Sequence, residues 1–412
     1  MYDVIICGAG PGGSFAAKIL AEAGYDVILI EKESIPRDKP CGGWITPKVL
    51  SLLKISPSNF TCIQPIKGAV IWIKEKEKLQ PYEIRYQKPV SYGIRRLEFD
   101  TLIVNQAKDL GAEVIDSTYV TRIIREKDTV LVQASKNQEF KGRFIIGADG
   151  THSIVARDCG FRKKWKPLEL TQCVVSETDI GEQGPNLTDY YGFPELFLNP
   201  KTMSYAWYFT KSTYLNIGLG IQMSKITPAC NIKTLYDDFL KKLRTINHLK
   251  EVKLAPLNAH TYPVYYGPYH YPTYGRRVLL VGDAGGFPIN YTGEGIRPAL
   301  LSGKFAAETL IDALEFSRLN LRNYFLKWNQ ALRNEYITGD IFQMIFSAID
   351  YELLKSVFLK DKRFRRLFFD LFFNLKNPRQ VLPRFLLYNR LFFYRYLHFG
   401  FRKILERLID FT

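Results

Sequence analysis

Residues 2–33 read YDVIICGAGPGGSFAAKILAEAGYDVILIEKE, and this stretch determines how the chain begins to fold. The apolar run over residues 4–6 predicts a short buried strand of a parallel sheet. Residues 11–23 predict a helix, because small and aliphatic residues recur along them and Gly24 follows. Residues 26–31 then predict a second buried strand. Together these elements form one strand–helix–strand unit.

The turn between the first strand and the helix carries four glycines, three of them spaced as G-x-G-x-x-G: Gly8, Gly10, Gly12 and Gly13. Glycine there permits a tight turn, close approach of the backbone to a pyrophosphate, and close contact between helix and strand. The phosphates would lie at the helix N-terminus, where free N–H groups favour negative charge. Glu31 ends the second strand, where a carboxylate binds ribose hydroxyls, and Lys32 follows it. The stretch predicts a Rossmann-like dinucleotide site without distinguishing NAD from FAD.

Two later segments each read as a buried strand that ends at an acidic residue. Residues 144–157 read FIIGADGTHSIVAR, with Asp149 in the turn, and residues 276–296 read RRVLLVGDAGGFPINYTGEGI, with Asp283 ending the strand. An acid in that position suits a sugar or ribityl hydroxyl. A long helix begins near Gly293, so its dipole would stabilise negative charge on a reduced flavin beside Gly295 and Ile296.

These motifs, in this order, resemble the FAD-dependent oxidoreductases of the aromatic-hydroxylase fold. RRLEFD at residues 95–100 is similar to the R-x-x-F-D segment of that superfamily, which implies that Arg96 contacts a flavin phosphate. The same resemblance places Val120 beside the adenine. Within the superfamily, the chain resembles the geranylgeranyl reductase family through KPCGGW at 39–44 and SYAWYFTKS at 204–212. Thr210 stands where that family has proline, and the resemblance covers about residues 1–330.

The resemblance implies an α/β fold: a Rossmann-like FAD-binding domain, an inserted antiparallel-sheet substrate domain and a helical C-terminal region. We divide the chain accordingly, with 1–60, 90–165 and 270–330 binding FAD, 61–89 and 166–269 forming the substrate sheet, and 331–412 forming a basic, aromatic helical region. Residues 68–86 predict two strands around a charged turn, and residues 203–221 predict a hairpin.

Three residues are candidates for the chemistry: Cys41, Tyr205 and Trp207. The resemblance implies that Cys41, with Gly42 and Gly43, lies on a loop beside the isoalloxazine, where its thiol would hold the flavin or donate a proton. The alternative is a small residue that merely fits the loop. Tyr205 and Trp207 share one face of a strand and would wall a pocket for an apolar chain. Their alternative is an ordinary sheet core.

The resemblance implies a flavoenzyme that reduces carbon–carbon double bonds of a polyprenyl lipid. The chain lacks a second G-x-G-x-x-G, so we expect NAD(P)H or an electron-donating protein to reduce the flavin transiently. The alternatives are a monooxygenase or halogenase, in which reduced flavin meets oxygen, and an electron carrier or binding protein without turnover.

The composition sets further limits on this chain of 412 residues. Its six cysteines show neither zinc-ligand nor disulfide spacing, which predicts no metal site and a reducing, cytoplasmic location. No apolar run reaches the roughly 18 residues that a membrane span needs, and we expect no signal peptide.

The last 58 residues, 355–412, carry 14 Lys and Arg against 4 Asp and Glu, together with 15 Phe and Tyr. In residues 362–376 the apolar side chains recur on one helical face. We expect this region to contact an anionic membrane peripherally, on its inner face, and not to bind nucleic acid. The alternative is an ordinary helical subdomain whose apolar faces pack on the flavin-binding domain.

Overall fold

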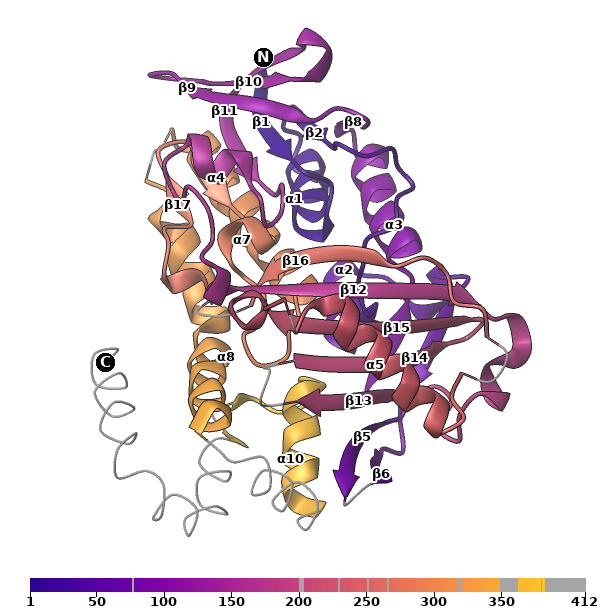
Figure 1. The fold of residues 1–412 in the computed structure, drawn as a ribbon. Helices are drawn as coiled ribbons and strands as arrows, with labels where there is room; N and C mark the ends of the chain where they lie inside the picture. The colour runs from indigo at the N-terminus through magenta and orange to yellow at the C-terminus, as the bar shows by residue number, and fades with distance from the viewer. Residues whose placement is uncertain are drawn as a thin grey trace.

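The computed structural model describes residues 1–75, 78–199, 204–228, 230–249, 252–264, 267–317, 320–348, 362–378 and 380–381. Its two large β-sheets lie one above the other in Figure 1, with helices packed around them. The N-terminal strand–helix–strand unit begins the upper sheet, and strands drawn from residues 68–263 build the lower sheet. The described part of the chain therefore has a mixed α/β fold, as the sequence predicts.

The upper sheet has a parallel centre, in the order β18-β11-β1-β2-β8, with β17 pairing antiparallel at its edge. A two-stranded branch, β10 and β9, extends from β11. The strands are β1 (Tyr2–Cys7), β2 (Val27–Ile30), β8 (Glu113–Ile115), β9 (Val120–Arg125), β10 (Val130–Ala134), β11 (Glu139–Gly147), β17 (Tyr274–Gly275) and β18 (Val278–Leu280). The strand predicted to end in Asp283 stops at Leu280 instead, and Asp283 lies in the short helix α6 (Gly282–Gly285).

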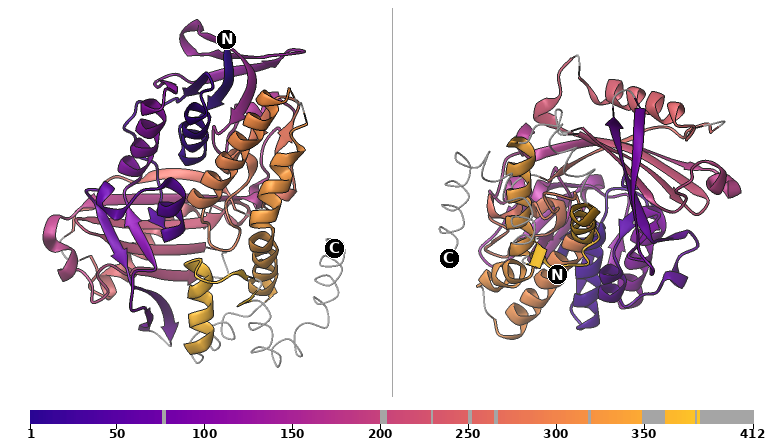
Figure 2. Two further views of the ribbon diagram at one scale, coloured as in Figure 1. Left: turned by 180° about the vertical axis from the view of Figure 1, so that it is seen from behind. Right: turned by 90° about the horizontal axis from the view of Figure 1, so that it is seen from below.

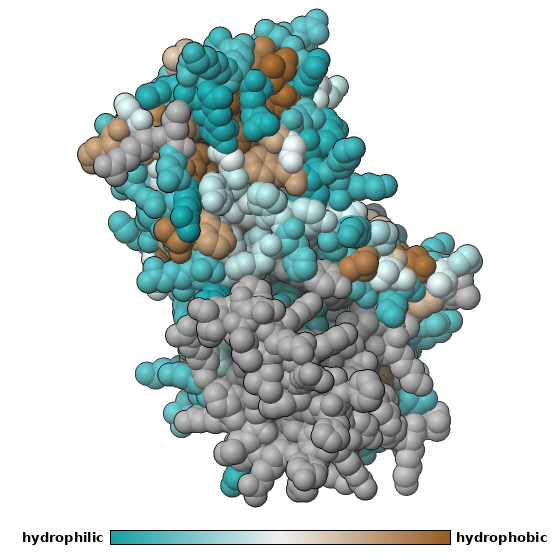
Figure 3. All heavy atoms as spheres, turned by 90° about the vertical axis from the view of Figure 1, so that its left-hand side faces the viewer, coloured by the Kyte–Doolittle hydropathy of each residue, from teal (hydrophilic) through white to brown (hydrophobic). Residues whose placement is uncertain are grey.

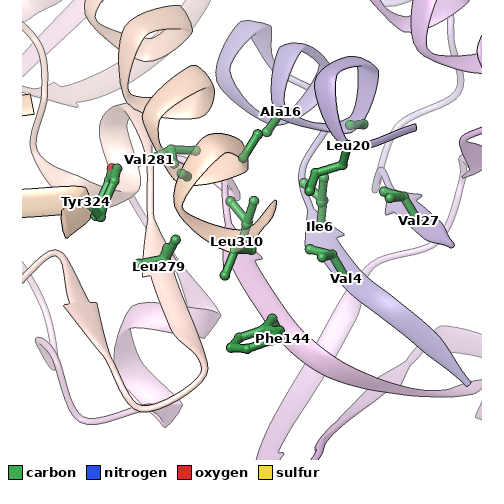
Figure 4. Close-up of a cluster of buried hydrophobic side chains, with 14 of the residues drawn as sticks. Val4, Ile6, Ala16, Leu20, Val27, Phe144, Leu279, Val281, Leu310 and Tyr324 are labelled. Atoms are coloured by element: carbon green, nitrogen blue, oxygen red, sulfur yellow. The ribbon is translucent and has the colours of Figure 1, made fainter. Parts of the chain in front are cut away.

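Four helices gather around this sheet: α1 (Pro11–Glu22), α3 (Arg96–Asp109), α7 (Ile296–Glu315) and α8 (Arg322–Ala348). Figure 4 shows the core between α1, α7 and the strands, where Ile6, Leu20 and Leu310 are fully buried. The opposite face is covered by the β9–β10 hairpin and by α4 (Ile154–Asp158). Helix α8 runs through residue 330, where we place a domain boundary, so no element ends there.

The lower sheet has seven strands, in the order β16-β12-β15-β14-β13-β5-β6, and only β13 and β5 pair in parallel. The strands are β5 (Gly68–Glu75), β6 (Lys78–Arg85), β12 (Leu170–Asp179), β13 (Pro194–Asn199), β14 (Ser204–Lys211), β15 (Tyr214–Gln222) and β16 (Asn258–Pro263). The two predicted hairpins are β5–β6 and β14–β15. Helix α5 (Ile232–Thr245) covers one face of this sheet, which leaves the other face to a cavity.

A small third sheet joins the two larger ones. It consists of β3 (Trp44–Ile45), β7 (Ser91–Ile94) and β4 (Ile63–Ile66), and α2 (Pro47–Leu53) follows β3. The loop that carries Cys41 leads into β3, so this sheet fixes the direction in which the loop leaves the upper domain.

Helix α10 (Lys362–Phe372) lies beside the lower sheet in both views of Figure 2 and in Figure 1. Phe364, Leu367 and Leu371, which we expected to face a membrane, are buried within the chain. These three residues of α10 therefore pack in a core that they share with residues of the lower sheet, and membrane contact of the region 355–412 remains a prediction. Residues 355–361, 379 and 382–412 of the predicted membrane region lie outside the described part.

Hydrophilic side chains cover much of the described surface on the side shown in Figure 3. In the part of the chain that the structure describes, no helix combines the length and hydropathy needed to cross a bilayer.

Candidate functional site

The glycine turn after β1 is shaped by close backbone contacts. Gly8 has φ +104°, and a Cβ there would lie 2.3 Å from the carbonyl oxygen of Ala148. A Cβ on Gly13 would lie 2.1 Å from the carbonyl oxygen of Gly8, so this glycine lets α1 pack against the strand. A Cβ on Gly10 would meet nothing within 4 Å, which places open space in front of α1. The turn is thus closed on its inner side and open where a phosphate would approach the helix N-terminus.

Glu31 is buried at the end of β2 and holds this turn. Its carboxylate accepts the backbone N–H of Ala9 at 2.8 Å and that of Glu33 at 3.1 Å. The guanidinium of Arg37 lies 3.5 Å from the same carboxylate and donates to the carbonyl oxygen of Ala9 at 3.2 Å. Each carboxylate oxygen keeps a second lone pair, so Glu31 retains the capacity to accept ribose hydroxyls.

A cavity of about 140 Å³ continues from Pro11, at the start of α1, and we call it the polar cavity because Lys39, Arg96, His260 and Asp283 line it. Its lining brings together nine of the predicted site residues: Cys41, Gly42, Arg96, Tyr205, Trp207, Asp283, Gly293, Gly295 and Ile296. The lining residues lie between Pro11 and Ala299, so segments far apart in the sequence converge on one concave surface.

Asp283 is the central charge of this cavity. Its carboxylate lies 3.4 Å from the ammonium of Lys39 and 3.7 Å from Nε2 of His260. Burial opposes ionisation of Asp283, but Lys39 and His260 lower its pKa well below the usual value. Burial lowers the pKa of His260, against the opposing effect of Asp283. At neutral pH Asp283 is therefore a carboxylate and His260 a neutral imidazole.

Arg96 begins α3 and is 5% exposed. It forms a bidentate pair with Asp100, with both N–O distances 2.7 Å, and it also interacts with the Cys41 thiol. Arg37 reaches the same Asp100 at 3.2 Å. Two guanidinium groups therefore share Asp100 beside the glycine turn, and Arg37 also lies beside Glu31, so two arginines and two carboxylates meet where a pyrophosphate would lie.

The loop with Cys41 crosses the cavity and is held by its own backbone. The N–H of Gly43 donates to the Cys41 sulfur at 3.3 Å, and the Gly43 carbonyl accepts the N–H of Ile94 at 2.7 Å. Gly43 has φ +63°, and a Cβ there would lie 2.1 Å from the Ile94 carbonyl oxygen. Cys41 itself is half-buried and not in a disulfide.

A second, larger and mostly apolar cavity, of about 310 Å³, opens on the other side of this loop. Strands β13 and β14, the segment 290–296 and α10 line it; Trp44, Leu196, Phe209 and Phe372 are among its walls. Cys41, Tyr205, Trp207 and Gly293 line both cavities. The Tyr205 and Trp207 rings stack with their centroids 5.5 Å apart, and the Tyr205 hydroxyl contacts that of Tyr262. The volume falls within the range of sites that bind small molecules.

Other predicted residues lie away from both cavities. The Lys32 side chain is 71% exposed and lies 3.4 Å from Glu33. Val120 is buried at the start of β9. Asp149 accepts the backbone N–H of Ile154 at 2.7 Å and of Val155 at 3.1 Å, so one oxygen caps α4, while its other oxygen is buried without a partner. We predict from the sequence that all three contact FAD, with Val120 beside its adenine, and those contacts remain predictions.

Four residues of this region were missed from the sequence: Arg37, His260, Tyr262 and Asn216. The crowding of tyrosine and histidine over residues 260–274 was a signal, but a surface loop explained it equally well. Arg37 and Asn216 carried no motif, because their importance comes from contacts with segments far away in the chain.

Comparison with known proteins bears on this geometry. Residues 1–296 match the model of the FAD binding domain family. Digeranylgeranylglycerophospholipid reductase 2 of Methanococcoides burtonii is 30% identical over 369 residues, which span 86% of this chain and 87% of that protein. The chain belongs to the geranylgeranyl reductase family of FAD-binding proteins.

The fold of this geranylgeranyl reductase family member is also found in solved structures. A geranylgeranyl bacteriochlorophyll reductase-like protein from Thermoplasma acidophilum superposes with a TM-score of 0.76 at 23% identity, covering 86% of this chain and 90% of that one. The halogenase PltM, in complex with phloroglucinol and FAD, has a TM-score of 0.69 at 19% identity, covering 92% and 85%. Both solved structures share the fold of this family member.

Proposed function

We propose that this protein uses FAD to reduce carbon–carbon double bonds of a polyprenyl lipid. The observation that supports the proposal best is the shared wall between the two cavities. Cys41, Tyr205, Trp207 and Gly293 face the polar cavity on one side and the apolar cavity on the other. An apolar chain in the larger cavity would therefore meet a cofactor in the smaller one at this wall. The name of the Methanococcoides relative supports the same substrate class.

The proposed FAD contacts run from the glycine turn, at the start of α1, to the N-terminus of α7. The glycine turn and α1 would hold the pyrophosphate, Glu31 the ribose, and Arg37 and Arg96 would supply positive charge. Asp283 would accept a ribityl hydroxyl, and the N-terminus of α7 would face the flavin pyrimidine. When bound and reduced, FAD supplies the hydride for the first carbon of the double bond.

The second carbon needs a proton, and two donors lie at the shared wall. One is the thiol of Cys41; the other is the hydroxyl pair of Tyr205 and Tyr262. The apolar cavity would exclude water and hold the chain in line, because an unactivated double bond reacts only when both partners are well positioned. Trp207, stacked on Tyr205, would keep the chain against this wall.

We also propose that NAD(P)H or an electron-donating protein reduces the flavin transiently, because the sequence carries a single G-x-G-x-x-G. The protein would work in the cytoplasm and meet an anionic membrane on its α10 side. Lys362, Arg363 and Arg366 of α10 are exposed, while Phe368 and Phe372 of the same helix line the apolar cavity. This arrangement places basic charge at the surface nearest the lipid-binding cavity.

Anaerobic reoxidation tests the function. The protein is reduced with dithionite and mixed with a geranylgeranyl phospholipid, and flavin absorbance is followed without oxygen. Reoxidation with saturation of the double bond, seen by mass spectrometry, is the expected result. Reoxidation that needs oxygen would indicate a monooxygenase or halogenase instead, and flavin that never turns over with lipid would indicate an electron carrier.

Membrane contact has its own test. The full-length protein should sediment with anionic vesicles at low salt and less at high salt. A variant with Lys362, Arg363 and Arg366 changed to Gln should sediment less, whereas loss of three lysines from the α5 surface, Lys233, Lys241 and Lys242, should not matter. A protein that stays in the supernatant with anionic lipid would contradict this part of the proposal.

A further inference from the structure

A buried ion pair lies directly behind the Cys41 loop. Lys211, at the end of β14, is 1% exposed, and its ammonium donates to Glu177 of β12 at 2.7 Å. The same ammonium donates to the carbonyl oxygen of Ile94 at 3.1 Å. A Cβ on Gly43 would lie 2.4 Å from the Lys211 ammonium, so the loop packs on this ion pair without intervening side chains.

Asn216 of β15 connects the ion pair to both parts of the shared wall. Its amide nitrogen donates to the Cys41 carbonyl oxygen and to the Glu177 carboxylate, both at 3.0 Å. Its amide oxygen accepts the indole N–H of Trp207 at 2.7 Å. The side chain is 1% exposed, and these three bonds use both donors of the amide nitrogen and one lone pair of the amide oxygen. One amide therefore sets the Cys41 backbone and the Trp207 ring relative to each other.

Packing of the sheet does not by itself require a buried polar network of Asn216, Glu177 and Lys211. A buried ion pair often contributes no more stability than well-packed apolar residues of similar volume, because both charges must lose water. A fully hydrogen-bonded polar network does, however, define one geometry among its members. Here the members are the loop that crosses the polar cavity and the ring that walls the apolar one.

We propose that Asn216, held by the Glu177–Lys211 ion pair, is a positioning residue that fixes the Cys41 loop against Trp207. The charged side chains of Glu177 and Lys211 line neither cavity. The network therefore acts through the Cys41 loop and the Trp207 indole. The consequence for catalysis rests on the proposed function, but the positioning of the loop does not. The test therefore begins with a readout that needs neither FAD nor lipid.

Alkylation of Cys41 by iodoacetamide in the apoprotein measures the position of the loop. Cys230 is likewise partly accessible and lies outside this network, while the other four cysteines are buried, so Cys230 serves as an internal reference. Peptide mass spectrometry gives the two rates separately. Asn216→Ala should change the ratio of the Cys41 rate to the Cys230 rate by about tenfold, since the loop loses its side-chain hydrogen bond.

Two further variants distinguish a change in the position of the Cys41 loop from a general effect on folding. Asn216→Leu has a similar volume and removes both the donor and the acceptor, so it should behave like Asn216→Ala. Ser176→Ala is the matched control, because Ser176 neighbours Glu177 on β12 and donates instead to the carbonyl oxygen of Ala255 at 2.8 Å. Its rate ratio should equal that of the wild type.

In the FAD-loaded protein, Asn216→Ala should shift the flavin absorbance spectrum and lower kcat more than it raises KM. Thermal melting checks that each variant is folded, and the paired change Glu177→Gln with Lys211→Met removes both charges of the ion pair, leaving Arg95, which lies 3.8 Å from Glu177 and is 22% exposed. A wild-type rate ratio in folded Asn216→Ala or Asn216→Leu overturns the proposal. If the ratio changes but no polyprenyl lipid is reduced by the wild type, the positioning stands and the proposed function fails.

Discussion

The hydroxyl of Tyr86 donates a hydrogen bond to the carboxylate of Asp370 at 2.9 Å, and so joins the end of the β5–β6 hairpin to α10. Asp370 is 3% exposed, and Arg366 and Lys376 lie 3.2 and 2.7 Å from the same carboxylate. Burial and Asp370 raise the pKa of Tyr86, which keeps the hydroxyl protonated as a donor. One carboxylate thus holds the helix that closes the apolar cavity.

Asp370→Ala should lower the free energy of unfolding by about 1–3 kcal/mol, because the Tyr86 hydroxyl loses its buried partner. Chemical denaturation measures this change. Asp238→Ala removes an exposed pair with Lys241, whose side chains are 54% and 71% exposed, and should change stability by less than about 1 kcal/mol. Equal effects of the two changes would mean that Asp370 does not fix α10.

Glu31→Ala and Asp283→Ala should each weaken FAD binding by at least about tenfold, since each removes a carboxylate from the proposed sugar contacts. Fluorescence titration of the apoprotein with FAD gives the Kd. Glu33→Ala is the control, because its side chain is 50% exposed and lies two residues from Glu31. Unchanged Kd values in both carboxylate variants would remove the basis for these two contacts.

Cys41→Ser should retain FAD and lower kcat by about tenfold or more if the thiol donates the proton, since general acid catalysis typically contributes 10²–10⁴-fold. Cys230→Ser supplies the comparison for a partly exposed cysteine remote from the cavities. If Cys41→Ser has wild-type kcat, the Tyr205–Tyr262 pair is the remaining proton donor. Tyr262→Phe should then lower kcat instead.

Acid should destabilise the cavity through His260. Its folded pKa is lowered from the ordinary value of 6.5, with burial as the main cause. The unfolded state then binds more protons than the folded state below that value, so this contribution to stability is present above pH 6.5 and is lost as pH falls through the folded pKa. His260→Gln should flatten the dependence of Tm on pH below about 6.5. An unchanged slope would show that another group titrates there.

Local sequence patterns predicted much of this fold. The glycine turn, the Glu31 strand end and the β14–β15 hairpin depend on neighbouring residues, and each lies where its pattern indicates. The family resemblance, and no local pattern, predicted that Cys41, Arg96 and Asp283 meet at one site.

The remaining features depend on contacts that no local pattern encodes. Residues 362–372 are amphipathic, and that pattern does not distinguish a lipid surface from the face of a sheet. Asn216 and Lys211 read as ordinary strand positions until β12, β15 and the Cys41 loop are brought together. Arg37 likewise gains its role only beside Glu31 and Asp100.

Apart from their shared wall, the two cavities are lined by different residues, and this has a consequence for protein engineering. The glycine turn, Glu31 and Asp283 belong to the upper sheet, whereas Leu196, Leu198 and Phe372 face only the apolar cavity. Substituting the latter group should retune the length and branching of accepted chains while nucleotide affinity stays constant. Libraries aimed at new prenyl substrates can therefore be confined to β13 and α10. Each variant can be screened for the yellow colour of bound FAD before it is screened for activity.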